Sequence, residues 1–307
     1  MADLVNEQNL LDEYKKYDFL NKEKAKIKIL VSYIKPSFLF KSEILTPIHL
    51  GSAVEKETSK SGNVSLEDLA WLHKNCEFND NFEGGISEYN RRIGFLTGTY
   101  WAWKNYEKLG NPEYFGSFGT RKLFVSKCLN NIVNYDIIIP TKETLKYQNN
   151  KEQFIEYHSS NLYKAIITNL KRVHPGDMNL FDEYLDKSYG YYHELYIMKK
   201  HIFFDFCSWI YPILIQLLND QDCKVIFDSD DVFSKCFQFH GVNEKRDIAY
   251  VTEILTGYFL FKLTCDKKIK YQECDYVVFE QMNNKKDVKK LMSLLRKNIE
   301  LKSRSNQ

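Results

Sequence analysis

The chain has 307 residues, with 43 Lys and Arg against 41 Asp and Glu, which gives a formal net charge of +2. Hydrophobic residues make up 44% and aromatic residues 15%, a composition that excludes a mainly disordered or collagen-like chain. The near-neutral charge argues against a dedicated nucleic-acid-binding protein, because such proteins gain most of their affinity by neutralising phosphates.

The predicted elements alternate between strands and helices. The strands are short and stop at prolines or turn residues, and the helices repeat apolar residues every three or four positions. The predicted strands are residues 26–33, 114–118, 135–139 and 191–198. The predicted helices lie within residues 7–20, 95–106, 142–184, 201–218, 247–263 and 284–307. This alternation predicts one α/β domain with a mixed sheet over residues 26–283, between a helical extension (1–25) and a basic amphipathic helix (284–307).

The cysteines and the apolar stretches bear on where the protein works. Seven cysteines are scattered without a Cys-x-x-Cys pair, which fits neither a disulfide framework nor a zinc cluster. Residues 1–28 lack the apolar run of a signal peptide, and the stretch Phe203 to Leu218 is too short to cross a bilayer comfortably. We therefore expect a cytoplasmic protein with reduced cysteines.

Ligands of α/β domains bind beyond the carboxyl ends of the strands. The loop after the first predicted strand, with Ser32, Tyr33 and Lys35, is therefore one candidate wall of a pocket. Gly51 is a candidate in a second wall, because a glycine lets the backbone approach a ligand closely. The alternative is that Gly51 only makes a turn.

The most distinctive string runs from Gly85 to Asn105. Ser87 suits the entry of a helix, and Tyr100 and Trp103 offer flat faces that stack on nucleobases or sugar rings. Lys104 could meet a phosphate. Alternatively, these aromatic side chains belong to the core.

A basic turn follows the strand at 114–118. Gly119 frees the backbone there, and Arg121 and Lys122 place two cations beside a strand end. Such a pair can clamp a diphosphate, since Arg binds phosphate oxygens through two hydrogen bonds and Lys adds a point charge. A solvated basic turn is the alternative.

Two acidic features could carry chemistry. Asp228 to Asp231 could be a D-x-D metal motif or an ordinary acidic turn, and we assign no metal ligand there. Glu253 lies in an apolar helix, where a carboxylate must be paired or have a shifted pKa. It could act as a general base or form a structural ion pair with Arg246 or Lys262.

Familiar catalytic motifs are missing from the sequence. It contains no G-x-S-x-G, H-E-x-x-H, P-loop or G-x-G-x-x-G string, so serine hydrolases, zincins, P-loop kinases and Rossmann dehydrogenases lose their usual support. The basic C-terminal helix could lie on an anionic membrane surface or pack on the domain.

The order of the segments resembles the bacterial capsular-polysaccharide glycosyltransferases catalogued as domain of unknown function 4422. The resemblance covers residues 26–261, and its most specific strings are Ile86–Glu88 and Tyr100–Asn105. The other matching segments are Lys35-Pro36, Pro47-Ile48, Gly51–Ala53, Leu96-Thr97, Tyr114–Gly116, Arg121, Tyr135-Asp136, Pro140, Tyr196–Met198 and Trp209–Leu214.

The sequence also departs from that family's pattern. Each departure exchanges a polar or aromatic residue of the kind that lines a site. The departures are Ile34 for His, Phe95 for Glu, Gly119-Thr120 for His-Tyr, Lys122 for a second Arg, and His193-Glu194 for an Asn pair.

The resemblance implies a GT-A-like α/β fold, with a mixed, mostly parallel sheet flanked by helices and with terminal helices. It further implies transfer of a hexose, galactose or galactofuranose, from a UDP-sugar to a surface polysaccharide or lipid-linked glycan. In this reading Asp136 or Glu253 orients or deprotonates the acceptor hydroxyl. Arg121 and Lys122 stabilise the leaving diphosphate, so no metal is required, although a divalent metal remains an alternative. The predicted donor-binding residues are Ser32, Tyr33, Lys35, Gly51, Ser87, Tyr100, Lys104, Arg121 and Lys122.

Two other functions remain open at this point. One is a non-catalytic nucleotide-sugar-binding scaffold in capsule or lipopolysaccharide assembly, suggested by the departures from the family pattern. The other is a peripheral membrane or nucleic-acid binder that works through the basic C-terminal helix. We expect no nucleic-acid partner for the transferase itself, and peripheral contact with the inner membrane through residues 284–307.

Overall fold

The computed structural model describes residues 6–23, 26–57, 64–158, 160–219 and 247–279. The acidic segment 228–231, Arg246 and the basic segment 284–307 therefore lie outside the described residues. Whether these segments bind metal, pair with Glu253 or contact a membrane stays a prediction.

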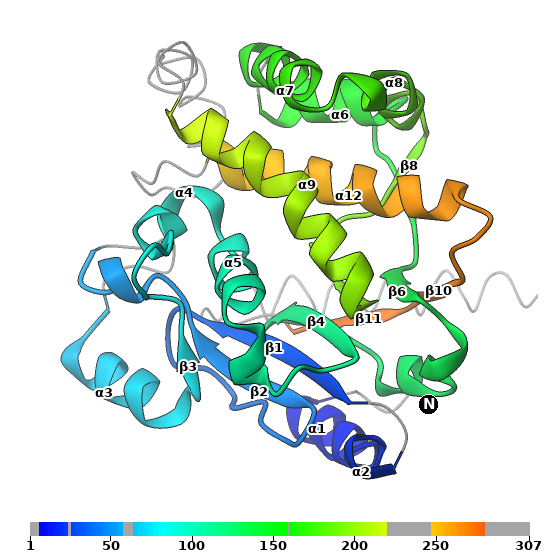
Figure 1. Cartoon of the computed structure of the whole chain (residues 1–307). Coiled ribbons are helices and arrows are strands. Elements are labelled where there is room, and N and C mark those ends of the chain that lie inside the picture. Colours follow the sequence, from blue (N-terminus) through cyan, green and yellow to red (C-terminus); the bar gives the residue numbers. More distant parts are fainter. Residues whose placement is uncertain (1–5, 24–25, 58–63, 159, 220–246, 280–307) are drawn as a thin grey trace, which may run out of the picture.

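A mixed sheet runs through the molecule in the order β10-β6-β9-β4-β1-β2-β3 (Figure 1). β1 pairs in parallel with β2 and β4, β2 with β3, and β6 with β10, whereas β9 is antiparallel to β4 and β6. The carboxyl ends of the parallel strands and the amino end of β9 therefore meet at one edge, called the carboxyl edge below. The strands are β1 (Ile27–Tyr33), β2 (Leu45–His49), β3 (Phe78–Asn79), β4 (Tyr114–Gly119), β6 (Ile137–Pro140), β9 (Tyr196–Lys199) and β10 (Tyr271–Cys274).

Short strands extend the sheet and build a separate ribbon at the same edge. β5 (Lys122–Phe124) folds back on β4 through the turn residues Thr120 and Arg121, and it pairs with β11 (Tyr276–Val278). β7 (Glu143–Thr144) and β8 (Tyr189–Gly190) form a two-stranded ribbon after β6. The β4–β5 hairpin carries the predicted basic turn with Arg121 and Lys122.

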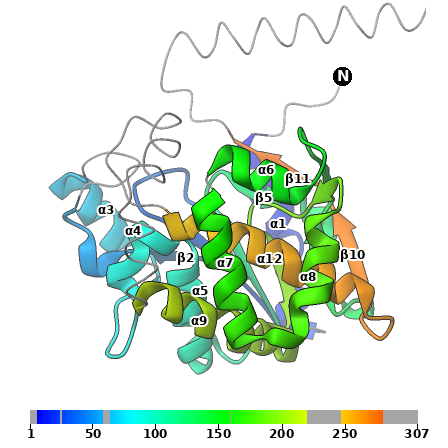
Figure 2. The same ribbon diagram turned by 90° about the horizontal axis from the view of Figure 1, so that it is seen from above.

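Each face of the sheet is covered by helices. β1 shows why: Leu30 packs in one apolar cluster, while Ile29 and Val31 pack in another on the opposite face. Helices α5 (Leu96–Lys104), α9 (Lys200–Asn219) and α12 (Asp247–Cys265) cover the first face, and α1 (Glu7–Lys15), α2 (Leu20–Glu23) and α3 (Leu66–Asn75) cover the second (Figure 1). A further layer lies outside α9 and α12 (Figure 2). It consists of α6 (Asn150–Tyr157), α7 (Ser160–Val173) and α8 (Met178–Leu185).

The helices α9 and α12 are long and apolar enough to cross a membrane by length and composition. In the fold, however, 61% of each apolar window is buried, and α12 packs against α9. Their apolar character is therefore explained by their place in the core.

The long helices and several sheet strands lie where the sequence predicts them, whereas most of the shorter strands were not predicted. The predicted mixed sheet with flanking helices is confirmed, and strands 26–33 and 114–118 and the helices at 95–106, 201–218 and 247–263 lie where they were expected. The strand predicted over 191–198 begins only at Tyr196, because the preceding residues form a turn. Elements that the sequence patterns did not predict are β2, β3, β5, β7, β8, β10, β11 and α3.

The N-terminal segment belongs to the core. Leu10, Leu11 and Tyr14 of α1 are buried in the apolar cluster on the α1 face of the sheet. The Tyr14 hydroxyl donates a hydrogen bond to the carbonyl of Phe124 in β5 at 2.9 Å. The predicted N-terminal extension is thus packed against the strand that carries Lys122.

Candidate functional site

The strand order brings several of the predicted site residues to the carboxyl edge. Ser32 of β1 lies opposite Ile48 of β2 and Gly119 of β4, so the ends of these three strands are neighbours. The turn of Arg121 lies just beyond Gly119. Residues far apart in sequence therefore surround one edge, as the carboxyl-end rule predicts.

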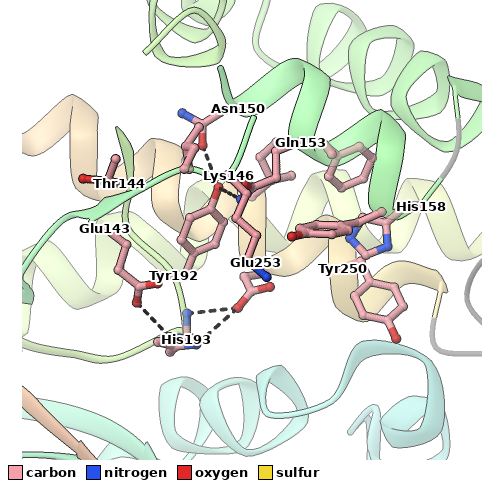
Figure 3. A pocket seen from close by; sticks show the side chains of 14 residues that line it. Glu143, Thr144, Lys146, Asn150, Gln153, His158, Tyr192, His193, Tyr250 and Glu253 are labelled. Atoms are coloured by element: carbon pink, nitrogen blue, oxygen red, sulfur yellow. Dashed lines mark hydrogen bonds and ion pairs between the residues drawn. The ribbon is translucent and has the colours of Figure 1, made fainter. Parts of the chain in front are cut away.

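A polar cluster forms where β5, β7, α12 and the turn before β9 meet. His193 Nε2 lies 2.9 Å from Glu143 Oε1, and Lys122 Nζ contacts His193 Nδ1. Glu253 accepts a hydrogen bond from the backbone N–H of His193 at 3.0 Å (Figure 3). Because a lysine ammonium can only donate, Nδ1 accepts and the Nε2 proton is donated to Glu143. His193 thus contacts a cation and two carboxylates, Lys122 and Glu143 through its ring and Glu253 through its backbone N–H.

The charges in this polar cluster influence one another. Burial lowers the pKa of Lys122, and the nearby carboxylates Glu253 and Glu143 oppose that shift. The hydrogen bond from His193 lowers the pKa of Glu143 most, burial raises it, and a hydrogen bond from Tyr276 lowers it further. Perturbed ionisable groups that converge in a cavity are typical of functional sites.

The backbone at His193 is unusual. His193 and Glu194 have φ angles of +75° and +53°, the left-handed region that side chains other than Gly and Asn rarely adopt. Such residues cost about 1–3 kcal/mol each and persist where their surroundings hold them. Here Glu253 binds the His193 N–H. An Asn pair, which the family resemblance places here, would adopt this conformation more easily.

A cavity of about 260 Å³ adjoins the polar cluster. Its walls include the carboxylates of Glu143 and Glu253 and a set of rings, Phe154, Tyr157, His158, Tyr192 and Tyr250 (Figure 3). Tyr192 is fixed by hydrogen bonds to Asn150 Oδ1 at 2.8 Å and from Gln153 Nε2 at 2.9 Å. Burial lowers the pKa of His158 to about 4, so this ring is neutral at pH 7. Aromatic faces beside hydrogen-bonding carboxylates suit a sugar ring.

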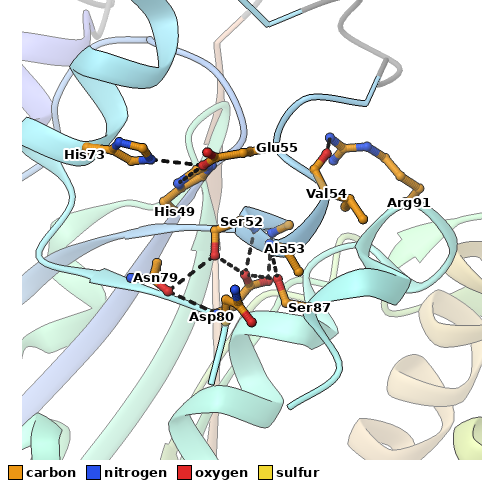
Figure 4. A network of polar contacts seen from close by, with 12 residues as sticks. His49, Ser52, Ala53, Val54, Glu55, His73, Asn79, Asp80, Ser87 and Arg91 are labelled. Atoms are coloured by element: carbon orange, nitrogen blue, oxygen red, sulfur yellow. Dashed lines mark hydrogen bonds and ion pairs between the residues drawn. The ribbon is translucent and has the colours of Figure 1, made fainter. Parts of the chain in front are cut away.

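A second network fixes the turn after β2. The fully buried Asp80 carboxylate accepts hydrogen bonds from the N–H groups of Gly51 at 2.8 Å and Ser52 at 3.1 Å, and from the Ser87 hydroxyl (Figure 4). Ser87 in turn accepts from the N–H of Ala53 at 3.1 Å. The hydroxyl of Ser87 therefore positions the turn. This structural role explains the serine without the predicted contact with the donor.

Gly51 is required by the backbone and by its surroundings. Its φ of +67° lies in the left-handed region, and a Cβ there would come within 2.8 Å of Asn90 Oδ1. The simpler interpretation of Gly51, a turn, therefore accounts for this glycine.

Three predicted donor-binding residues have other partners in the structure. Tyr33 is fully buried, and its hydroxyl donates to the carbonyl of Phe38 and accepts from the N–H of Phe40. Tyr100 is partly buried and packs against Tyr211 of the core with ring centroids 4.8 Å apart. Lys104 lies at the other end of the sheet, because α5 leads towards the start of β4, and its Nζ is 3.6 Å from the ring centroid of Trp103.

Asp136 is also misplaced as a catalytic residue. It precedes β6 and therefore lies at the edge opposite the polar cluster. Its carboxylate accepts from Lys199 Nζ at 2.9 Å and from the N–H of Lys270 at 2.8 Å, which ties the β6, β9 and β10 ends together. Asp136 has a structural role and does not belong to this site.

The other predicted residues remain at the carboxyl edge. Ser32 is 5% exposed, Lys35 is half-buried just after β1, and Arg121 is exposed at the tip of the β4–β5 hairpin. Glu253 lines the cavity, and Lys262, one of its expected ion-pair partners, is bound instead to Asp177 at 2.7 Å. Their ligand contacts stay predictions.

Two departures from the family pattern touch each other. A Cβ on Gly119 would come within 2.9 Å of the ring of Phe95. A larger residue at 119 would therefore collide with this ring. Gly119, where the family pattern has His, and Phe95, where it has Glu, are therefore best understood as a pair.

Some important residues escaped prediction. Asp80 sits in the run Asn79-Asp80-Asn81, which resembles any polar loop, and no sequence signal marks it as buried. Glu143 could have been found, because it follows the end of a predicted strand closed by Pro140. His193 was visible only as a departure from the family pattern.

Comparison with solved structures shows which known protein has a similar fold. The apo structure of the bifunctional glycosyltransferase WbbM is similar with a TM-score of 0.65 and 22% identity, over 83% of this chain and 46% of that chain. This chain thus spans about half the length of WbbM. The mannosyltransferase Ktr4p from S. cerevisiae gives a TM-score of 0.31 and 12% identity over 90% of this chain and 81% of that chain, which supports no conclusion.

No curated protein matches the sequence. The mixed α/β fold, with a mostly parallel sheet flanked by helices, is similar to that of a glycosyltransferase structure. A family description, "Domain of unknown function (DUF4422)", matches residues 28–264, which is more than half of the chain. The chain therefore belongs to the DUF4422 family.

Proposed function

We propose that the protein is a glycosyltransferase that moves a hexose from a UDP-sugar to a surface polysaccharide or a lipid-linked glycan. Membership of the family and the fold shared with WbbM support this proposal. The observation that carries it is the polar cluster of Lys122, His193, Glu143 and Glu253 at the mouth of a ring-lined cavity. Galactose, as pyranose or furanose, is the proposed sugar.

The donor would bind along the carboxyl edge. Ser32 and Lys35 lie on the side where the nucleoside would sit, and Arg121 and Lys122 at the hairpin would hold the diphosphate. A guanidinium can bind phosphate oxygens through two hydrogen bonds, and cations fixed before the reaction stabilise the charge that develops on the leaving group. Lys122 is already held by His193, so little reorganisation is needed.

The acceptor sugar would enter the cavity, where a base must remove a proton from the attacking hydroxyl. Two carboxylates are available. Glu143 already accepts hydrogen bonds from His193 and Tyr276, which lower its pKa and engage its carboxylate. We therefore assign the base to Glu253, which the His193 N–H orients.

We infer a metal-free mechanism, in which the hairpin cations would do the electrostatic work of a divalent ion. The D-x-D segment 228–231 lies outside the described residues, so a divalent metal stays an alternative. Chelation distinguishes the two mechanisms.

Calorimetric titration with a panel of nucleotide sugars tests donor binding. We expect Arg121→Ala and Lys122→Met each to weaken UDP-sugar binding about 10- to 100-fold, since a charge-assisted hydrogen bond contributes about 1.5–3 kcal/mol. Lys127→Ala is the matched control, an exposed lysine just beyond β5. EDTA should leave binding unchanged. Full sensitivity to EDTA, with no effect of either substitution, would refute the cation clamp.

Turnover separates an enzyme from a scaffold. We expect Glu253→Gln to bind the donor normally and to lose at least about 100-fold in transfer or donor hydrolysis, the usual contribution of a general base. If the unchanged protein binds a nucleotide sugar but never hydrolyses or transfers it, the scaffold function is correct instead.

A cytoplasmic location with peripheral contact to the inner membrane through residues 284–307 belongs to the same proposal. Sedimentation with anionic lipid vesicles tests it, with the chain lacking residues 285–307 as the control. We expect the shortened chain to lose vesicle binding and to keep donor binding. Loss of both would favour the alternative function of a membrane binder.

A further inference from the structure

Three potential metal ligands converge beside the turn after β2, and the proposed function uses none of them. His49 ends β2, Glu55 follows the short helix η1 (Ser52–Val54), and His73 lies in the last turn of α3. Their ligand atoms all lie within 4.8 Å of one another (Figure 4). His73 Nε2 is 3.0 Å and His49 Nδ1 is 3.9 Å from the same oxygen, Oε2 of Glu55.

His49 is the most informative of the three. The residue is 2% exposed, and its Nδ1 faces Glu55 without a hydrogen-bond partner. A buried polar atom left without a partner costs about 1–3 kcal/mol, so this nitrogen needs an explanation.

We propose that His49, Glu55 and His73 bind a divalent transition-metal ion, with Zn²⁺ the best fit. Two imidazoles and one carboxylate are a common zinc ligand set, whereas Mg²⁺ and Ca²⁺ prefer oxygen ligands alone. Zn–N bonds of about 2.0–2.1 Å place neighbouring tetrahedral ligands roughly 3.3 Å apart. The ligand atoms now lie within 4.8 Å of one another, so they would have to draw closer around the ion.

The three ligands differ in exposure, which indicates what kind of site they make. The side chains of His49 and Glu55 are 3% and 20% exposed, whereas that of His73 is 57% exposed. The ion would therefore have its fourth position open to solvent. It would fasten α3 to the turn that Asp80 holds, outside the proposed donor site.

The test uses the full chain without added histidines, stripped of metal with a chelator. Calorimetry with Zn²⁺ and visible absorption with Co²⁺ measure the affinity and the coordination. We expect one ion per chain, and His73→Ala or Glu55→Gln to weaken binding at least about 100-fold, since even indirect ligand supports contribute 10- to 100-fold. His201→Ala, which removes an exposed histidine of α9, should bind as the unchanged chain does.

Two results would overturn the site. Equal Zn²⁺ affinity in His73→Ala and in the unchanged chain would place the metal elsewhere, for instance on cysteines, which all variants keep. If the unchanged chain binds no Zn²⁺, the contact of His73 with Glu55 is an ordinary ion pair. Because His73 is exposed, its loss should not unfold the protein, and thermal unfolding without metal verifies this.

Discussion

The Asp80 carboxylate offers the sharpest test of how the carboxyl edge is held. It is fully buried and accepts hydrogen bonds from the N–H groups of Gly51 and Ser52 and from the hydroxyl of Ser87. Asp80→Asn keeps the shape but replaces one oxygen with a donor that faces other donors. Hydrogen bonds to a charged acceptor contribute about 1.5–3 kcal/mol, and a stranded buried donor costs about 1–3 kcal/mol. We therefore expect a loss of about 3–5 kcal/mol of unfolding free energy.

Urea unfolding followed by circular dichroism at pH 7 measures this loss. The matched control is Asp68→Asn, because Asp68 also accepts a backbone N–H, that of Ser65 at 3.0 Å, but at the exposed start of α3. A cap of this kind contributes about 1 kcal/mol. If Asp80→Asn lowers the unfolding free energy no more than the control does, the network does not hold the turn as we infer.

Two further predictions concern packing and pH. Gly257→Ala should lower the unfolding free energy by about 1–3 kcal/mol, because the added Cβ would come within 2.4 Å of the Tyr184 hydroxyl. Gly176→Ala is the control, since a Cβ there meets open space. Equal unfolding free energies of the two variants would contradict this prediction. His158 has its folded pKa lowered to about 4 by burial, so its contribution is present above the unfolded pKa of about 6.5 and is lost as the pH falls towards 4. The unfolding free energy of His158→Phe should therefore fall less between pH 7 and pH 4 than that of the unchanged protein, by at most about 3 kcal/mol. If the two pH profiles are the same, His158 is not the cause of the fall.

The sequence predicted the sheet better than the residues around it. β1 and β4 are apolar on both faces, and this composition predicts strands in the middle of a buried sheet. The rule that ligands bind beyond carboxyl ends then selects Ser32, Arg121 and Lys122. The role of Asp136 came instead from the family resemblance, which does not say at which edge of the sheet this residue lies, and the predicted strand 135–139 begins two residues before β6.

The polar cluster could not be predicted, because its members meet only through the fold. Glu253 and His193 are 60 residues apart, and the left-handed turn that aims His193 has no glycine or asparagine to announce it. The aromatic string around Tyr100 shows the opposite difficulty. It is distinctive in sequence, yet edge-to-face packing on Tyr211 and stacking on a ligand require the same side chain, so its pattern alone could not decide between core and binding site.

The packing of α1 has a practical consequence for protein production. The family match begins at residue 28, yet Tyr14 is bonded to the carbonyl of Phe124 and its ring lies 6.4 Å from that of Phe118. A shortened chain that begins at the match would leave those phenylalanines uncovered and would invite aggregation. Expression should therefore begin no later than Asn6, the residue that caps α1.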